Sequence, residues 1–273
     1  MDQVISGGFG TRRPWSRDYI RIVTWNIERG LQFDAILKFL RTAQADLILL
    51  QEVDLNARRT HNRDVASELA RSLRLNYFFG REFEELSEGS ASSPAYHGQA
   101  TLSPWPLSSG RIIRFHHQSN FWKPHWFVPD IQFFQRRLGG RIALTSEALI
   151  YGRPIVSYNL HLESQDENNI IRHQQLTETL EDARQYTESS SVLVAGDFNM
   201  NAGNGDADML LHSAGFVDAV RLPKVPTTPV RGLFQAGRSI DWIYVSEDVR
   251  SEGCVHNNVR ASDHYPVSVM VRR

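Results

Sequence analysis

The chain has 273 residues and a formal net charge of −1, with 41% hydrophobic and 22% charged residues. These values are close to those of ordinary globular domains, so they exclude a disordered or fibrous class. The length suits one large α/β domain or two small ones. Because the net charge is almost zero, the chain has no overall positive field, and any polyanionic partner must be held by a local patch.

A single cysteine, Cys254, excludes an internal disulfide framework and fits a reducing compartment. No segment approaches 18 consecutive apolar residues, and the N-terminus lacks the apolar region of a signal peptide. We therefore expect a cytoplasmic protein without a membrane anchor, and we expect it to act as a monomer.

The N-terminal residues, 1–18, carry Gly, Arg and Ser without a hydrophobic period, and we expect them to form a loose arm. Alternating apolar residues begin at Tyr19 and predict a strand that runs into the polar residues around Asn26 and Glu28. Because no linker or repeat divides the chain after the arm, residues 19–273 are expected to form one domain.

Helix and strand patterns alternate in the next part of the chain. Apolar residues in 33–40 recur at the spacing of an amphipathic helix. The apolar run at 47–50 predicts a buried strand, and Glu52 lies at its end. A second helix is expected over 62–74, with Asn62 as its N-cap. Further strands are expected at 76–79 and 98–102.

An irregular lobe with basic and aromatic residues is expected at about 104–140. Between residues 108 and 141 there are six Lys or Arg residues and only one acid, Asp130. Aromatic side chains interleaved with cations suit stacking on bases and holding phosphates. An irregular lobe whose aromatic rings simply pack together is the alternative. The candidate substrate-binding residues of this lobe are Trp122, Trp126, Arg136 and Arg137.

Regular patterns return in the second half of the chain. Strands are expected at 142–150 and 154–162, followed by a polar helix from about residue 168 to residue 186. A short helix near 207–214 and strands at 239–245 and 267–271 complete the chain. This mixture of strands and helices favours an α/β fold.

The most informative stretch is SVLVAGDFNMN, residues 191–201. Its apolar run at 192–195 has no helical period, which is typical of a fully buried strand. Asp197 and Asn199 follow directly, so an acid and an amide are delivered to the edge of a sheet, where α/β folds place functional groups. An ordinary turn at a strand end is the alternative, because Gly, Asp and Asn are common turn residues.

The same arrangement recurs along the chain, because one predicted strand after another ends in a polar group. Carboxylate and amide oxygens without a cysteine ligand set suit Mg²⁺ or Mn²⁺ rather than structural zinc, and such a metal implies a phosphate substrate. Histidines near carboxylates supply a base and groups that neutralise charge on a phosphoryl transition state. The strand-end residues are Asn26, Glu52, His161, Asp197, Asn199, Asp263 and His264.

Only two of the ten histidines, His161 and His264, are singled out by this pattern. The other eight, His97 among them, are assigned ordinary structural roles. Asp241 lies within a predicted strand between apolar residues, where an unpaired carboxylate would be costly to bury. We predict His264 as its partner.

Six motifs, TWNIE, LLQEV, NLHLES, AGDFN, IDWIYV and SDHYPV, occur between Thr24 and Val267. In order and spacing they resemble the endonuclease/exonuclease/phosphatase superfamily, also called DNase I-like. In motif style the chain is most similar to the tyrosyl-DNA phosphodiesterase and AP endonuclease-like branches. The HLES tetrad with Arg172 and Gln175 resembles the first branch, although Phe198 stands where that branch commonly has Thr.

The resemblance implies a four-layer α/β sandwich, in which two mixed β-sheets pack face to face with helices outside. It also implies a metal site at one end of the sheets. Glu52 would be the principal Mg²⁺ ligand, for which Mn²⁺ substitutes, with Asn26 beside it. Asp263 would contribute directly or through water, and Glu28 stands where many members carry an acid that reaches the metal through water.

The resemblance further implies roles for the catalytic residues. Asp197 would orient or deprotonate the attacking water, and Asn199 would contact the scissile phosphate. His161 would donate a hydrogen bond to a non-bridging phosphate oxygen. His264, held by Asp241, would bind the phosphate or act as general acid or base. Which of Asp197 and His264 is the base stays open.

These observations predict a Mg²⁺-dependent phosphodiesterase, most concretely a nuclease or DNA-end-processing enzyme with nucleic acid as its partner. The alternative is a phosphatase or phospholipase-like enzyme that acts on inositol phosphates or sphingomyelin. A more remote alternative is an inactive binding scaffold that has kept the fold.

Overall fold

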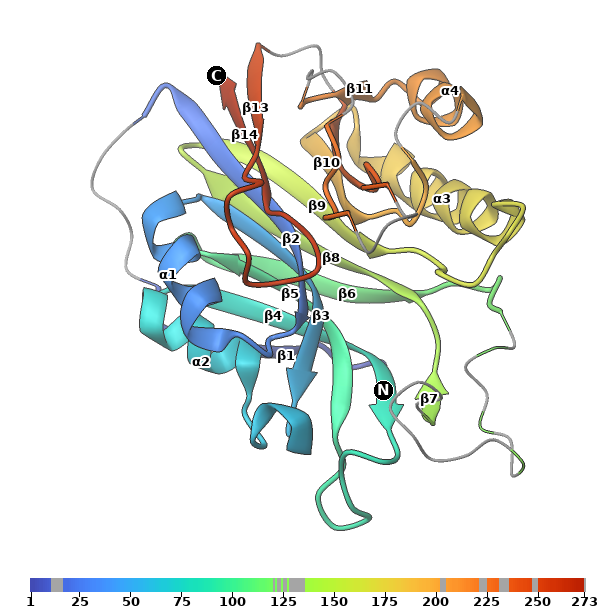
Figure 1. Ribbon diagram of the computed structural model, residues 1–273. Helices are drawn as coiled ribbons and strands as arrows, with labels where there is room; N and C mark the ends of the chain where they lie inside the picture. The colour runs from blue at the N-terminus through green and yellow to red at the C-terminus, as the bar shows by residue number, and fades with distance from the viewer. Residues whose placement is uncertain are drawn as a thin grey trace.

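The computed structural model describes residues 1–10, 17–119, 121, 124, 127, 136–201, 205–220, 225–230, 236–246 and 250–272. Two mixed β-sheets form its centre, with α1 and α2 on the outer side of one sheet and α3 and α4 on the outer side of the other (Figure 1). The predicted four-layer α/β sandwich is therefore confirmed.

The larger sheet has the strand order β1-β4-β5-β3-β2-β14-β13, and β7 pairs with β4 outside this path. Strands β2 and β3 are parallel, and the other pairs are antiparallel. The strands are β1 (Ile5–Gly8), β2 (Tyr19–Arg29), β3 (Leu47–Leu55), β4 (Asn76–Glu85), β5 (Tyr96–Ser103), β7 (Arg137–Gly139), β13 (Ser251–Val255) and β14 (Val267–Arg272).

The smaller sheet has the strand order β11-β12-β10-β9-β8-β6, with one parallel pair, β9 and β10. Its strands are β6 (Leu107–Arg114), β8 (Ile142–Ile150), β9 (Arg153–His161), β10 (Ser191–Asp197), β11 (Val217–Asp218) and β12 (Asp241–Val245). Each sheet thus has a parallel pair whose strands end at the same edge, and both edges contribute side chains to one polar cluster.

The helices cover the outer faces with apolar stripes. They are α1 (Phe33–Ala43), α2 (Val65–Leu73), α3 (Ile170–Ala183) and α4 (Gly205–Ser213), with short 3₁₀ turns η1 (Arg58–Thr60) and η3 (Arg184–Tyr186). In α1, Ile36 and Leu40 are buried one turn apart. The N-cap of α2 is Asp64, whose side chain accepts from the Ser67 amide, and not the predicted Asn62. In the described chain no helix is long and apolar enough to cross a bilayer.

Both faces of the central strands are buried, which explains their nearly continuous apolar runs. In β2, Ile22 faces the layer between the sheets, whereas Val23 and Trp25 face the helices α1 and α2. Leu193 and Ala195 of β10 meet the same middle layer from the other sheet. The two sheets therefore share one apolar layer and place their strand ends side by side.

Buried amides join the sheets across this layer, with Gln51 and Asn159 among them. The Gln51 side chain donates hydrogen bonds to Asn159 Oδ1 at 2.7 Å and to Thr24 Oγ1 at 3.1 Å. Asn159 in turn donates to the carbonyl oxygens of Leu50 and Ala100, at 3.1 and 3.0 Å. Because buried polar groups must be hydrogen-bonded, these contacts fix how one sheet lies on the other.

Two predictions about the N-terminal half are wrong in part. The expected loose arm contains β1, which pairs with β4 at the edge of the larger sheet. Its sequence, Ile-Ser-Gly-Gly, is too short to show a period. The expected irregular lobe at 104–140 contains β6, which pairs with β8. A register shift between Ser108 and Arg111, with Ser109 at a φ of 50°, breaks the alternation of β6.

Replacing Asn159 with Leu, which has a similar shape, is expected to destabilise the fold. The variant removes the acceptor of Gln51 and leaves the Leu50 and Ala100 carbonyls without their donor, which costs about 2–4 kcal/mol of unfolding free energy. Urea denaturation checks this, with Asn168→Leu at an exposed position as the control. Equal midpoints for the two variants would contradict the role of the inter-sheet amides.

Candidate active site

The strand ends of both sheets converge on one place. Asp197 at the end of β10 lies beside His161 at the end of β9 and opposite Asp241 at the start of β12. Asn26 of β2 donates a hydrogen bond from Nδ2 to Asp197 Oδ2 at 3.1 Å, which joins the larger sheet to this group. The structure therefore brings together polar residues that are far apart in the sequence.

The backbone is left-handed at three of the predicted site residues. Glu28, Glu52 and Asn199 have φ values of 46°, 49° and 52°, a region that L-residues with side chains rarely adopt. The β2–β3 and β3–β5 registers shift beside the first two. Such conformations persist only where surrounding contacts enforce them, and they often lie at functional sites.

Glu52 lies among cationic and imidazole groups. Its side chain is 20% exposed, and Oε2 is 3.5 Å from the Arg29 guanidinium. Burial disfavours the charged carboxylate, but the nearby guanidinium groups, with Arg29 first and Arg137 after it, outweigh it and hold the pKa of Glu52 well below its usual value. The residue is thus a carboxylate at neutral pH.

Asp197 lies between two imidazoles. Its Oδ2 atom is 3.7 Å from His161 Nε2 and 3.7 Å from His264 Nε2. Its Oδ1 atom accepts a hydrogen bond from the Asn199 amide at 2.8 Å. Asn199 is held in turn by Leu162, whose carbonyl accepts from Nδ2 at 3.1 Å. This makes Asp197 the centre of the polar cluster.

His264 is paired with Asp241, as the sequence predicts. Nδ1 lies 2.9 Å from Asp241 Oδ2, and both residues are buried. Burial opposes the charged ring, but the carboxylates of Asp241 and Asp197 outweigh it and raise the pKa of His264 to about 10. The indole of Trp25 donates to the His264 carbonyl at 2.9 Å, which fixes the backbone of this residue.

His161 is oriented by a cation. The Arg141 guanidinium donates to His161 Nδ1 at 2.9 Å, and the same guanidinium nitrogen pairs with Glu82 Oε1 at 2.6 Å. Because Nδ1 accepts this hydrogen bond, the ring hydrogen is on Nε2, the atom that faces Asp197. His161 therefore presents a hydrogen-bond donor to the site.

Helix α3 holds the loop that follows His161. Arg172 donates to the Ser164 carbonyl at 3.0 Å, and Gln175 accepts from the Glu163 amide at 2.9 Å. The Glu163 carboxylate accepts from the Ser164 amide at 2.9 Å within the loop. The Arg and Gln of the motif are thus positioning residues for the loop after β9.

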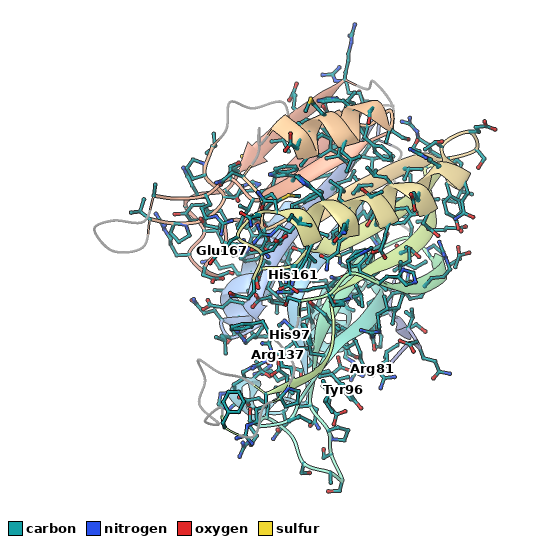
Figure 2. The ribbon with its side chains drawn as sticks, turned by 90° about the vertical axis from the view of Figure 1, so that its right-hand side faces the viewer. Arg81, Tyr96, His97, Arg137, His161 and Glu167 are labelled. Atoms are coloured by element: carbon teal, nitrogen blue, oxygen red, sulfur yellow. The ribbon has the colours of Figure 1, made fainter. Side chains whose placement is uncertain are left out.

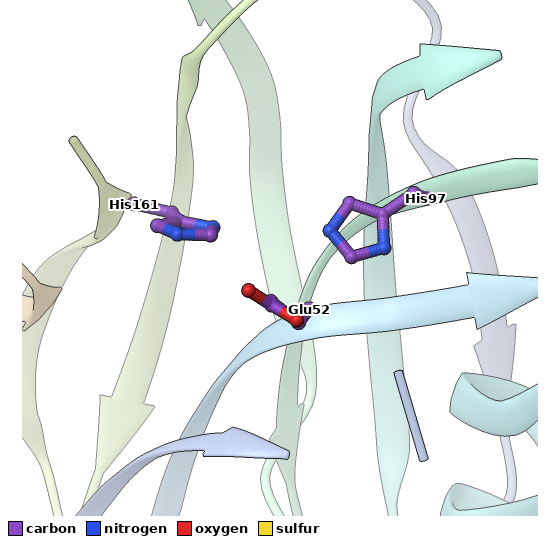
Figure 3. A group of neighbouring side chains, drawn as sticks. All are labelled: Glu52, His97 and His161. Carbon is purple, nitrogen blue, oxygen red and sulfur yellow. The ribbon is translucent and has the colours of Figure 1, made fainter. Parts of the chain in front are cut away.

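His97 is the residue that sequence reasoning missed. It lies on β5 opposite Asp54 of β3, with its Nδ1 3.1 Å from Asp54 Oδ1, and it is fully buried. Burial holds the pKa of His97 below its usual value. Figure 3 shows the rings of His97 and His161 on either side of the Glu52 carboxylate. Because the partner acid is on another strand, no local pattern marked this histidine.

The other predicted ligands lie nearer the edge of the cluster. Asp263 is half-buried beside His264, and its Oδ1 is 3.3 Å from Ser262 Oγ. The Glu28 amide donates to Asn26 Oδ1 at 3.1 Å. Among the described residues, ligand atoms close enough to share an ion, all within 4.8 Å of one another, occur in two groups, Glu52 with His97 and His161, and Asp197 with Asp241 and His264.

The predicted basic patch is largely neutralised. Trp122 and Trp126 lie outside the described residues, and the Arg136 carbonyl accepts from the Leu86 amide at 3.0 Å. Arg137 is buried near His97 (Figure 2) and ion-paired with Glu85 at 2.8 Å, so it is not an exposed contact for nucleic acid. Four of the six cations pair with acids from outside the segment, in Arg111–Asp182, Arg114–Asp2, Arg137–Glu85 and Arg141–Glu82.

A sequence model described as the Endonuclease/Exonuclease/phosphatase family matches residues 23–264, and the chain belongs to this family. Members of the family are hydrolases that act on phosphoester bonds and generally use a divalent metal. A sequence search of curated proteins finds no match.

Solved structures share the fold at low sequence identity. An endonuclease/exonuclease/phosphatase from Beutenbergia cavernae is 18% identical, with a TM-score of 0.66 over 94% of this chain and 72% of that one. Truncated Caenorhabditis elegans TDP2 is 17% identical, with a TM-score of 0.64 over 93% and 98%. The human Nocturnin catalytic domain, solved with a bound sulfate, is 18% identical, with a TM-score of 0.66 over 99% and 97%.

The ion pair behind His161 gives a pH-dependent stability. Burial disfavours a charged Glu82, but the Arg141 guanidinium outweighs it and lowers the pKa of Glu82 from 4.5 to about 2. The stabilisation is therefore complete above pH 4.5 and is lost as the pH falls through 2. We expect Glu82→Gln to lower the unfolding free energy by about 3 kcal/mol at pH 7 and by about 1 kcal/mol at pH 3.

Chemical denaturation at both pH values measures this difference, and Glu181→Gln on the exposed side of α3 is the control. A Glu82→Gln deficit that is the same at pH 7 and pH 3 would show that the Glu82 charge does not stabilise the fold.

Proposed function

We propose that the chain is a Mg²⁺-dependent phosphodiesterase, with nucleic acid or a nucleotide-linked phosphodiester as its leading substrate class. The observation that carries the proposal is the position of Asp197, 3.7 Å from each of two imidazoles. Hydrolysis of a phosphodiester needs a group that takes a proton from water and donors that neutralise the phosphoryl oxygens, and this arrangement offers both.

The donor set of the site fits a divalent metal. Glu52 is an ionised and partly exposed carboxylate, and Asn26 lies on the neighbouring strand opposite Gln51, the residue before Glu52. Together with Asp263, and with Glu28 through water, these residues would hold Mg²⁺, or Mn²⁺ in its place. When bound, such an ion supplies a Lewis acid for the phosphoryl oxygen.

The remaining roles follow from hydrogen-bond geometry. His161 presents Nε2–H toward Asp197 and would donate to a non-bridging oxygen of the phosphate. Asp197 would take the proton from the attacking water. His264 lies 3.7 Å away, is a cation at neutral pH because its pKa is raised to about 10, and would stabilise charge on the phosphate with its ring oriented by Asp241. Asn199 would contact the scissile phosphate.

Two observations support a nucleotide-type substrate. The Arg81 guanidinium lies 4.9 Å from the centre of the Tyr96 ring, and this cation and aromatic pair lies on the side of the molecule that also carries His161 and His97 (Figure 2). The sulfate in the Nocturnin structure and the likeness to TDP2 point to related chemistry in proteins of this fold.

A phosphatase or phospholipase-like activity on inositol phosphates or sphingomyelin is the second candidate. It is favoured by the ion pairs that occupy four of the six cations of the predicted basic patch, because these cations would otherwise bind a long polyanion. We also infer that the protein is a monomer and that it is located in the cytoplasm. The exposed free thiol of Cys254 supports a reducing compartment.

The variants Asp197→Asn and His264→Ala are each expected to lower kcat at least about a hundredfold, because the first removes the carboxylate that takes the proton and the second removes the cation that stabilises the phosphate. Steady-state kinetics on bis-p-nitrophenyl phosphate measures the loss, and circular dichroism verifies folding. His212→Ala, at an exposed position on α4, is the control. Normal turnover by both site variants would contradict the site assignment.

A substrate panel distinguishes the two candidate classes. Plasmid DNA, single-stranded oligonucleotides, a 5′-phosphotyrosyl oligonucleotide, an inositol polyphosphate and sphingomyelin are incubated with a Mg²⁺ titration, with EDTA and Asp197→Asn as controls. We expect cleavage of the nucleic-acid substrates that stops in EDTA. Turnover of the inositol or lipid substrate with DNA left intact would move the protein to the second class.

A further inference from the structure

His97 has a ring nitrogen that the described part of the chain leaves without a hydrogen-bond partner. The side chain is fully buried, and its Nε2 atom has no hydrogen bond to any described residue. A buried polar atom in this condition costs free energy unless something else satisfies it. The residues around His97 indicate which kind of ligand would satisfy its Nε2 atom.

The proton position on His97 follows from Asp54. The Asp54 carboxylate is held as an anion by Arg59, whose Nε is 2.7 Å from Oδ2, and the other oxygen lies 3.1 Å from His97 Nδ1. A carboxylate only accepts, so Nδ1 carries the hydrogen and Nε2 carries a lone pair. A carboxylate behind an imidazole is the usual support of a metal-binding histidine.

His161 shows the opposite arrangement on the other side of Glu52. Arg141 donates to its Nδ1 at 2.9 Å, so its hydrogen lies on Nε2. One histidine thus offers a lone pair to the site and the other a hydrogen. The difference comes from the residue behind each ring, an acid for His97 and a guanidinium for His161.

The lone pair of His97 faces an anion. Ligand atoms of Glu52, His97 and His161 all lie within 4.8 Å of one another, and the Glu52 carboxylate lies between the two rings (Figure 3). A lone pair and a carboxylate that close repel each other unless a cation lies between them. A divalent metal bound to Glu52 would satisfy both.

We propose that His97 is a nitrogen ligand of the metal at Glu52 and that it raises the affinity of this site for Mn²⁺, Co²⁺ or Zn²⁺ relative to its affinity for Mg²⁺, which still binds. Imidazole suits these transition metals, whereas Mg²⁺ prefers oxygen donors. This inference deepens the proposed function. It depends on the proposed function only because it requires that Glu52 bind a divalent ion. Asp54 is then the positioning residue that sets the ring.

The variant His97→Asn tests the proposal directly. An Asn amide can replace Nδ1 toward Asp54 but has no atom in the place of Nε2. We expect Mn²⁺ affinity, measured by electron paramagnetic resonance on the metal-stripped full chain, to fall about tenfold or more. Mg²⁺ affinity, measured by competition with Mn²⁺, should change far less. Spin-echo modulation from an imidazole nitrogen on bound Mn²⁺ should be lost from the variant.

Two further variants keep the result interpretable. His61→Asn, at an exposed position with a φ of 57° that Asn tolerates, is the matched control and should bind both ions as the native chain does. His97→Gln places an amide oxygen near the former Nε2, so its preference should shift toward Mg²⁺. This variant carries the test if circular dichroism shows that His97→Asn does not fold.

The outcomes separate this proposal from the proposed function. Unchanged Mn²⁺ affinity and nitrogen modulation in both His97 variants would overturn the role of His97 while leaving a metal-dependent phosphodiesterase intact. A native chain that binds neither Mn²⁺ nor Mg²⁺ would overturn both. Loss of the Mn²⁺ preference in the His97 variants alone supports the proposal.

Discussion

The hydrogen bond between Gln51 and Asn159 is the contact on which the rest of the structure depends. It joins the larger sheet to the smaller one within the buried layer between them, at 2.7 Å and without access to water. An amide pair has a defined direction, so it fixes the relative position of the sheets, which apolar packing alone leaves free to slide. Glu52 follows Gln51 directly, and His161 lies two residues after Asn159, so the same contact sets the site.

Buried ion pairs form the wall of the site beside these strand ends. Arg141 with Glu82 and Arg137 with Glu85 place guanidinium groups near His161 and Glu52, where their charges favour a carboxylate at Glu52. Replacing both partners of such a pair by apolar residues is often neutral, because both charges lose their hydration, whereas removing one partner leaves a buried charge unpaired and destabilises the fold. Their effect here is on the electrostatics of the site, because they keep acids ionised and rings oriented.

The neighbours of a histidine determine its chemistry more than its position in the chain does. His264 has a carboxylate behind Nδ1 and another in front of Nε2, His161 has a guanidinium behind it, and His97 has Asp54. The three rings therefore present different hydrogen-bonding atoms to one small volume. Histidine thus supplies the site with three different groups, an ion pair from His264, a hydrogen-bond donor from His161 and a lone pair from His97.

The sequence by itself determined the α/β class, the strands that end in polar residues, and the pairing of Asp241 with His264, because apolar runs and buried charges leave local patterns. Tertiary structure alone decided the roles of residues whose partners lie on other strands. His97 looked ordinary because Asp54 is a cross-strand neighbour, and the cations around Arg137 looked like a basic patch because their acids are distant in sequence. A local sequence pattern shows the hydrophobic periodicity of a segment. It does not show which charged residue from another strand will lie beside that segment after folding.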